Sequence, residues 1–148
     1  MDQGRDITPL LALQSMFFGS NVDKMDKKSF CRATDLDSSQ VEMLCRLQLL
    51  CPLEEDSFDD QDLAMARLLK ECIDLGVAPE DLAFYPVFAR QIVDSELQLR
   101  EQYTRELSNR ENADLTLELT RLARGLRAYI IDRTMANSLL QFKGIRKT

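Results

Sequence analysis

The sequence predicts a mostly α-helical protein, on three observations. The 148 residues include only five Gly and four Pro, too few for a turn-rich fold of many short strands. Apolar residues recur at spacings of three and four in each main segment. Asp, Ser and Pro stand where these segments begin, and Gly stands where two of them end. Together these features are typical of a chain of amphipathic helices.

Two short helices are expected first. Residues 7–18 are apolar at helical spacings and stop at Gly19, which is a suitable helix end. We expect this leading helix to dock on another part of the molecule. A second helix is expected over residues 27–33, with Phe30 and Ala33 facing inward.

A third helix follows a turn at residues 34–37. Asp37 or Ser38 is expected to cap it by accepting hydrogen bonds from the free amides of its first turn. It should run to about Leu47, and Pro52 closes the unit because proline cannot extend a helix. The apolar residues expected in the core of this region are Phe30, Ala33, Leu36, Val41, Leu44, Leu49 and Leu50.

The next helix is expected over residues 61–75. Residues 53–58 before it are short and acidic, with room for at most a tiny hairpin. Asp59 or Asp60 is expected to cap the helix. Its predicted buried stripe, at spacings of three, three and four, consists of Leu63, Ala66, Leu69 and Ile73.

Three further breaks shape the middle of the chain. Gly76 is placed to end the preceding helix in a left-handed conformation. Residues 78–81 place Pro and two acids at the start of another short helix, where the helix dipole favours negative charge. Tyr85-Pro86 is expected to interrupt the chain again.

Two long helices are expected in the C-terminal part. The first covers residues 86–107, and residues 108–112 form a polar turn. Asp114 or Thr116 is expected to open the second helix. Long amphipathic helices in a small chain usually pack on each other or on a second copy. We therefore expect a homodimer, with a dimerisation surface formed by Ile92, Val93, Leu97, Tyr103 and Leu107.

The charge of the chain is uneven. The net charge is −6, and residues 24–62 hold ten acidic and five basic residues. An acidic surface repels phosphate, so nonspecific binding to nucleic acid or anionic lipid is not expected. No apolar run approaches the roughly 20 residues that cross a bilayer, and residues 1–6 lack the basic start of a signal peptide. We expect a cytoplasmic protein without membrane contact.

The chemistry-bearing residues are sparse. There is no histidine, which removes the usual general base of Ser, Cys or Thr catalysis. The four cysteines contain no CxxC pair, so they are expected to be reduced and mostly core-filling. We expect no catalytic residues, no metal site and no cofactor, and the chain is predicted not to be an enzyme.

Residues 31–85 resemble the DNA-binding domain of the MerR family of transcription regulators. The family motif reads as a helix, a "tGvs" turn, a recognition helix containing "IRyYE", then "GLLxP", a wing, and a helix ending in "LGfsLeeI". Here CRATDLDSSQVEMLCRLQLLCP (31–52) follows the first part without a gap, and FDDQDLAMARLLKECIDLGVAPEDLAFY (58–85) follows the second. The resemblance implies a MerR-like winged helix-turn-helix followed by two long C-terminal helices.

The departures from the motif concern the DNA-reading face. Glu42 and Met43 stand where the family has the Arg and first Tyr of "IRyYE", which help to contact the DNA backbone. The wing is reduced to residues 53–58, with three acids and no base. A carboxylate facing phosphate reverses the sign of the interaction. The remaining candidates for DNA contact are Lys27, Lys28, Arg32 and Arg46.

These observations predict three segments. Residues 1–22 form the leading helix, residues 23–85 form the winged helix-turn-helix, and residues 86–148 form a helical dimerisation and regulatory region. The expected function is that of a MerR-type transcription regulator, or the regulatory and dimerisation portion of one. It would act mainly through protein contacts, with weak DNA binding by this chain alone. The extra leading helix suggests that a separate upstream unit reads the DNA.

Two alternatives remain open at this stage. The chain could be a true DNA binder that uses a basic stripe on the last helix, made of Arg121, Arg124, Arg127 and Arg133. Acidic neighbours within salt-bridge reach favour a solvated mixed-charge face instead. Alternatively, the chain could be a helical module for a small apolar ligand lined by Tyr103, Tyr129 and Phe142. The effector and operator cannot be derived from the residues.

Overall fold

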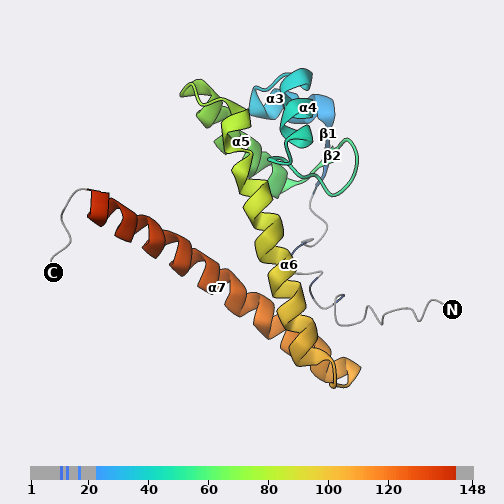
Figure 1. Cartoon of the computed structure of the whole chain (residues 1–148). Coiled ribbons are helices and arrows are strands. Elements are labelled where there is room, and N and C mark those ends of the chain that lie inside the picture. The colour runs from blue at the N-terminus through green and yellow to red at the C-terminus, as the bar shows by residue number, and fades with distance from the viewer. Residues whose placement is uncertain (1–10, 12, 14–16, 18–22, 143–148) are drawn as a thin grey trace. The chain divides into compact units, whose positions relative to one another are not determined.

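Helices dominate the computed structural model of the chain, which describes residues 11, 13, 17 and 23–142. The expected leading helix (7–18) lies outside the described residues, apart from Leu11, Leu13 and Phe17. The elements are shown in Figure 1, and their order is β1 (Met25–Asp26), α3 (Lys27–Thr34), α4 (Ser38–Arg46), β2 (Ser57–Phe58), α5 (Asp60–Asp74), a 3-10 turn (Pro79–Leu82), α6 (Phe84–Thr104) and α7 (Asn109–Phe142). The expectation of a mostly α-helical protein is confirmed.

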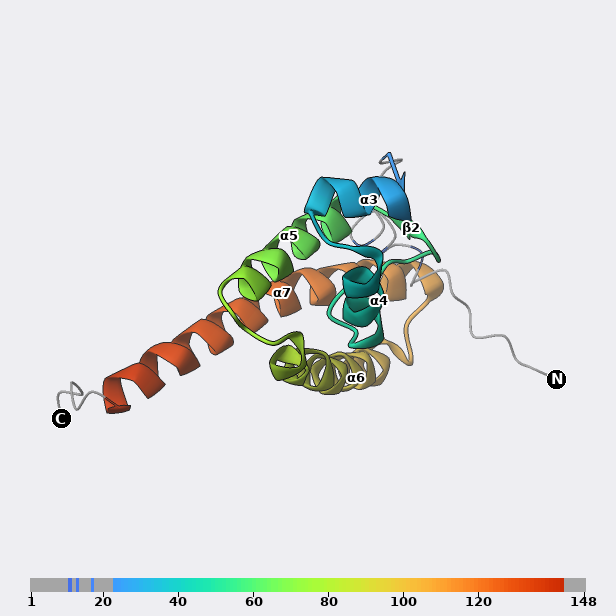
Figure 2. The ribbon, with the colours of Figure 1, turned by 90° about the horizontal axis from the view of Figure 1, so that it is seen from above.

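The chain divides into two units, and each is described by itself. One unit is Gly19–Ser95, and the other joins Met1–Phe18 to Glu96–Thr148. In the first unit α3 packs beside α5 (Figure 2), and β1 pairs with β2 in a two-stranded antiparallel sheet. Met25 lies opposite Phe58 in this pairing. No helix within the described residues is long and apolar enough to span a bilayer.

Reciprocal caps fix the start of α4 and α5. The Asp37 carboxylate accepts a hydrogen bond from the Gln40 backbone at 2.7 Å, and the Gln40 side chain accepts one from the Asp37 backbone at 2.9 Å. Asp59 and Asp62 repeat this arrangement, with both distances 2.9 Å. Each box satisfies two amide groups that would otherwise lack a partner. The expected caps at Asp37 and Asp59 are confirmed.

The same left-handed terminator ends α4 and α5. After α5, Gly76 has φ 89°; its amide donates to the Ile73 carbonyl and the Val77 amide donates to the Cys72 carbonyl. This is the Schellman arrangement, and it confirms the expected role of Gly76. After α4, Gln48 stands at the position that Gly76 has after α5, with φ 59°. The Gln48 amide donates to the Cys45 carbonyl, and the Leu49 amide donates to the Leu44 carbonyl.

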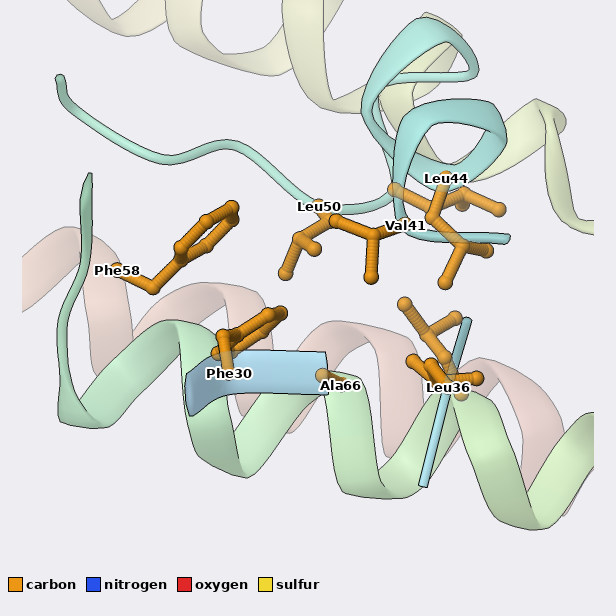
Figure 3. Packing of buried hydrophobic residues seen from close by; sticks show 9 residues of the cluster. Phe30, Leu36, Val41, Leu44, Leu50, Phe58 and Ala66 are labelled. Atoms are coloured by element: carbon orange, nitrogen blue, oxygen red, sulfur yellow. The ribbon is translucent and has the colours of Figure 1, made fainter. Parts of the chain in front are cut away.

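A single hydrophobic core holds the first unit together (Figure 3). The rings of Phe30 and Phe58 are stacked with centroids 4.0 Å apart and an interplanar angle of 8°. Phe30 comes from α3, and Phe58 lies at the end of the acidic 53–58 segment, so the stack joins this segment to α3. Buried around it are Leu36, Val41, Leu44, Leu49, Leu50, Ala66 and Leu69.

One residue of the expected core is wrong. Ala33 is exposed, and its neighbour Thr34 is buried instead. Ala33 and Thr34 follow Phe30 by three and four residues and so flank it on opposite sides of the helix face, and the core lies on the side of Thr34. The Thr34 hydroxyl donates to the Phe30 carbonyl at 2.8 Å, which makes burial of this polar residue inexpensive.

Two expected helix boundaries are also wrong. Tyr85-Pro86 does not interrupt the chain, because α6 begins at Phe84 and Pro86 occupies its first turn, where an amide hydrogen is not needed. The last helix begins at Asn109 and not at Asp114 or Thr116. Ser108 caps it: its hydroxyl oxygen accepts a hydrogen bond from the Glu111 backbone amide at 3.3 Å, and the Glu111 carboxylate accepts one from the Ser108 backbone at 3.2 Å.

In the second unit, a buried polar cluster joins the end of α6 to the start of α7. The Arg100 guanidinium donates to the Thr116 hydroxyl oxygen at 2.8 Å and to the Asn112 amide oxygen at 3.0 Å. The Thr116 hydroxyl in turn donates to Asn112, and Thr116 has no exposed surface. A buried network of this kind fixes the register of two helices because a shift leaves its members unpaired.

Candidate functional site

The exposed side of α4 carries an ion pair at the position where the sequence departs from the MerR motif. Lys27, in the first turn of α3, donates to the Glu42 carboxylate at 2.6 Å. Ser38 also donates to this carboxylate, at 3.4 Å. The hydrogen bond from Lys27 lowers the pKa of Glu42 and raises the pKa of Lys27. Both groups are therefore charged at neutral pH, and the cation is neutralised locally.

A second ion pair lies at the acidic 53–58 segment. Glu54 and Ser57 are bridged across a tight turn, and Asp56 within it has a left-handed φ of 51°. Lys24 donates to the Glu54 carboxylate at 2.7 Å. Glu55 and Asp56 remain exposed at the tip of the turn. The expectation of at most a tiny hairpin is confirmed, and its tip presents carboxylates and no base.

The four predicted DNA-contact residues are not equivalent in the structure. Lys27 is engaged by Glu42, as described above. Lys28, Arg32 and Arg46 are exposed, with no ion pair to any residue that the structure describes. They lie in a unit whose residues 23–95 include sixteen acidic and eight basic side chains. An excess of negative charge of this size opposes the approach of phosphate to any of them. We name the surface formed by Glu42, Glu54, Glu55 and Asp56, together with the paired Lys24 and Lys27, the acidic face.

Four of the predicted dimerisation residues lie on α6, and Leu107 lies in the loop that follows it. Val93, Leu97 and Tyr103 have 39%, 47% and 61% of their surface exposed, and Ile92 and Leu107 are half-buried. On α7 the exposed apolar residues are Leu122, Leu126, Tyr129, Ile130, Ile131, Met135, Leu139, Leu140 and Phe142. Large apolar side chains gathered on one exposed helix are typical of interaction sites in soluble proteins.

The basic stripe of the last helix is engaged by neighbouring side chains. Arg121 pairs with Glu118 at 2.8 Å, and Arg127 pairs with Glu96 of α6 at 2.9 Å. The Arg133 guanidinium lies over the ring of Tyr129 on the same helix, 5.1 Å from the ring centroid. Arg124 makes a similar contact with Phe17, at 4.7 Å from the ring centroid. A mixed-charge face, and not an open stripe of cations, is what these contacts form.

A cavity of about 520 Å³ lies within the first unit, and sequence reasoning missed it. Its described lining comes from the end of α4, the segment after it and the first half of α6, and consists of Cys45, Gln48, Leu50, Cys51, Pro52, Pro86, Ala89, Arg90 and Val93. These segments are about 40 residues apart, so no local spacing pattern reports their meeting. The aromatic residues proposed from the sequence as ligand-lining, Tyr103, Tyr129 and Phe142, are instead exposed on α6 and α7.

The cysteines are free thiols. Cys51 is exposed, and Cys31, Cys45 and Cys72 are half-buried. Among the described residues, no three Cys, Asp or Glu side chains lie close enough together to hold a metal ion. Partial desolvation of the sulfur atoms raises the pKa of the Cys45 and Cys51 thiols, and the nearby Asp62 carboxylate raises both further, so both thiols are protonated at neutral pH.

Comparison of the chain with protein-family models, with curated proteins and with solved structures finds no match.

Proposed function

We propose that this chain is a MerR-like winged helix-turn-helix that serves as a cytoplasmic regulator, or as the regulatory portion of one, through protein contacts. In this proposal the acidic face meets a protein, and DNA is read by a separate unit. The chain itself performs no chemistry. The proposal builds on the resemblance of residues 31–85 to the family motif and on the geometry of the corresponding positions.

Backbone conformation supports the assignment to a MerR-like fold. The quoted motif contains three glycines, in "tGvs", "GLLxP" and "LGfsLeeI". The corresponding residues here are Asp35, Gln48 and Gly76, with φ of 58°, 59° and 89°. Glycine is the residue that adopts left-handed φ without strain. Two of the three glycines have been replaced, yet the left-handed conformation is present at all three positions.

The Lys27–Glu42 ion pair is the observation that carries the functional part of the proposal. Glu42 occupies the place of the motif arginine, and it binds a nearby cation that would otherwise be available to phosphate. Compared with the family motif, this surface lacks the positive charge of the arginine and gains the negative charge of Glu42. The ion pair also neutralises the positive charge of Lys27. A surface of this kind repels a DNA backbone and attracts a basic protein surface.

Fluorescence anisotropy with random duplex DNA, at low and near-physiological salt, tests this proposal. The wild-type chain is expected to bind no more tightly than about 10⁻⁴ M at near-physiological salt, the weak end of nonspecific association. Micromolar binding that falls steeply with salt would contradict the proposal.

A charge-reversal pair tests the position of the acidic face. Glu42→Arg restores the motif arginine and frees Lys27, so it is expected to give measurable, salt-dependent DNA binding. Glu71→Arg makes the same change of net charge at an exposed position of α5 and is the matched control. Equal gains in the two variants would mean that only net charge matters and that the acidic face is not a lost DNA-reading face.

Homodimerisation is the second part of the proposal, and it rests on the exposed apolar residues of α6 and α7. Sedimentation velocity is expected to give a dimer of the full chain. Leu126→Asp on α7 should yield a monomer, because a charge within a helix–helix contact is left without a partner. Leu75→Asp, at an exposed leucine after α5, should leave the dimer intact. A wild-type monomer at micromolar concentration would refute this part.

A further inference from the structure

The cavity between the end of α4 and the first half of α6 has the dimensions of a ligand site. Its volume of about 520 Å³ falls within the range of roughly 300–1,000 Å³ that small-molecule sites occupy. All of its lining residues belong to Gly19–Ser95, so it is formed within one unit of the chain. None of the residues that define the acidic face lines it.

The lining has the composition of an apolar site with one charge. Five of its residues are aliphatic or proline side chains, namely Leu50, Pro52, Pro86, Ala89 and Val93. Cys45 and Cys51 add two thiols, and the Cys51 thiol lies 3.2 Å from the Gln48 carbonyl oxygen, to which it donates. Protonated thiols behave as small, soft apolar groups. The cavity therefore offers an apolar wall to a ligand.

Arg90 is the only charged residue among the described lining residues. It makes no hydrogen bond or ion pair with any residue that the structure describes. A guanidinium has five donors in a planar fork that matches the two oxygens of a carboxylate. A free guanidinium beside an apolar cavity can bind an amphipathic anion, because the guanidinium binds the charged group and the apolar wall contacts the rest of the ligand.

We propose that this cavity binds a small organic acid, with its carboxylate on Arg90 and its apolar body against Leu50, Val93 and the two thiols. Arg90 is the charged residue of the described lining, and the apolar side chains beside it distinguish this position from the exposed cations Lys28, Arg32 and Arg46. The negative charge of the unit opposes polyphosphates more than a monocarboxylate, because the repulsion grows with the charge of the ligand. The inference does not depend on the proposed function, since a regulator or any other helical module could bind such a ligand here.

Calorimetric titration of the full chain tests the proposal with three probes, 4-phenylbutyrate, octanoate and indole-3-acetate. Each acid is paired with its neutral amide, which has the same shape and no charge. At least one acid is expected to bind, about tenfold more tightly than its amide, because a charge-assisted hydrogen bond to a guanidinium is lost in the amide. Failure of all three acids to bind at millimolar concentration, or equal binding of acid and amide, would overturn the proposal.

Arg90→Gln tests where the carboxylate lies. This variant is expected to bind the acid about tenfold more weakly, at the level of the amide, with binding of the amide unchanged. Arg67→Gln is the matched control, because Arg67 is an exposed arginine of α5 outside the cavity. Equal weakening in both variants would show a general charge effect and would overturn the assignment to Arg90.

The four cysteines provide an independent footprint. Alkylation by iodoacetamide, followed by mass spectrometry of each site, is expected to slow at Cys45 and Cys51 when the acid is bound. Cys31 and Cys72 lie outside the cavity lining and should react at an unchanged rate. Equal protection of all four thiols, or protection of Cys31 and Cys72 alone, would place the ligand elsewhere. This readout needs no DNA, and repeating it with the Leu126→Asp variant separates it from dimerisation, to which Val93 of the lining is also assigned. Its failure is therefore distinguishable from failure of the proposed function.

Discussion

Replacing Gln48 by glycine should stabilise the protein, although it removes a side chain. Gln48 ends α4 in the same Schellman arrangement in which Gly76 ends α5, and its φ is 59°. A left-handed conformation brings the Cβ atom of an L-residue close to the following carbonyl oxygen, whereas glycine has no Cβ atom. The Gln48 side chain is exposed, so little packing is lost.

The expected gain follows from two opposing contributions. Relief of the left-handed strain is worth about 1–2 kcal/mol. Against this, the greater freedom of glycine in the unfolded chain costs about 0.4–1 kcal/mol. The difference predicts that the free energy of unfolding rises by about 0.5–1 kcal/mol in Gln48→Gly. For a unit of this size, that corresponds to an increase in Tm of about 2–8 °C.

Thermal and urea unfolding, followed by circular dichroism, measure this change. Arg46→Gly, two residues earlier in the last turn of α4, is the matched control because that position is helical. The control should be destabilised by about 0.5–1 kcal/mol, since glycine has no strain to relieve there. If Gln48→Gly lowers Tm as much as Arg46→Gly does, Gln48 is not left-handed in solution and the comparison with the family motif fails at this position.

Three further changes probe the core, the polar cluster and the acidic face. Phe30→Ala should lower the free energy of unfolding by about 3–5 kcal/mol in urea titrations, because the buried ring leaves a cavity, whereas Phe88→Ala at a half-exposed position should cost much less. Thr116→Val keeps the shape of the side chain but removes the hydroxyl oxygen that accepts a hydrogen bond from Arg100. The free energy of unfolding should fall by about 1–3 kcal/mol, seen as faster hydrogen exchange in α7. Unchanged exchange would refute the role of the cluster. The pKa of Glu42 is lowered, so the stability that its carboxylate contributes is present above its usual pKa of 4.5 and is lost as the pH falls through the lowered pKa. The difference in Tm between wild type and Glu42→Gln should therefore be constant from about pH 6 to 9 and vanish in acid. A difference that stays constant down to about pH 2 would argue against the ion pair.

Local features of the fold could be predicted from the sequence alone. The caps at Asp37 and Asp59 and the terminator at Gly76 depend on hydrogen bonds between residues at most five apart, so the residue types at those positions determine them. Most of the first core was also predictable, because burial of an amphipathic helix follows its periodicity. Ala33 shows the limit of that pattern, since a Thr that bonds its own helix backbone is as easily buried as an alanine.

Only the tertiary structure decided which distant residues meet. The sequence predicts a helix break at Pro86. The structure places Pro86 in the first turn of α6, because that helix begins two residues earlier, at Phe84. The sequence identified both Lys27 and Glu42, yet the pairing that removes Lys27 from the candidate phosphate ligands arises because α3 and α4 pack together. The cavity around Arg90 likewise requires α6 to lie near the end of α4. Local sequence sets hydrogen bonds and periodicity within a helix, whereas contacts across about 40 residues depend on how the whole core packs, and no short pattern encodes them.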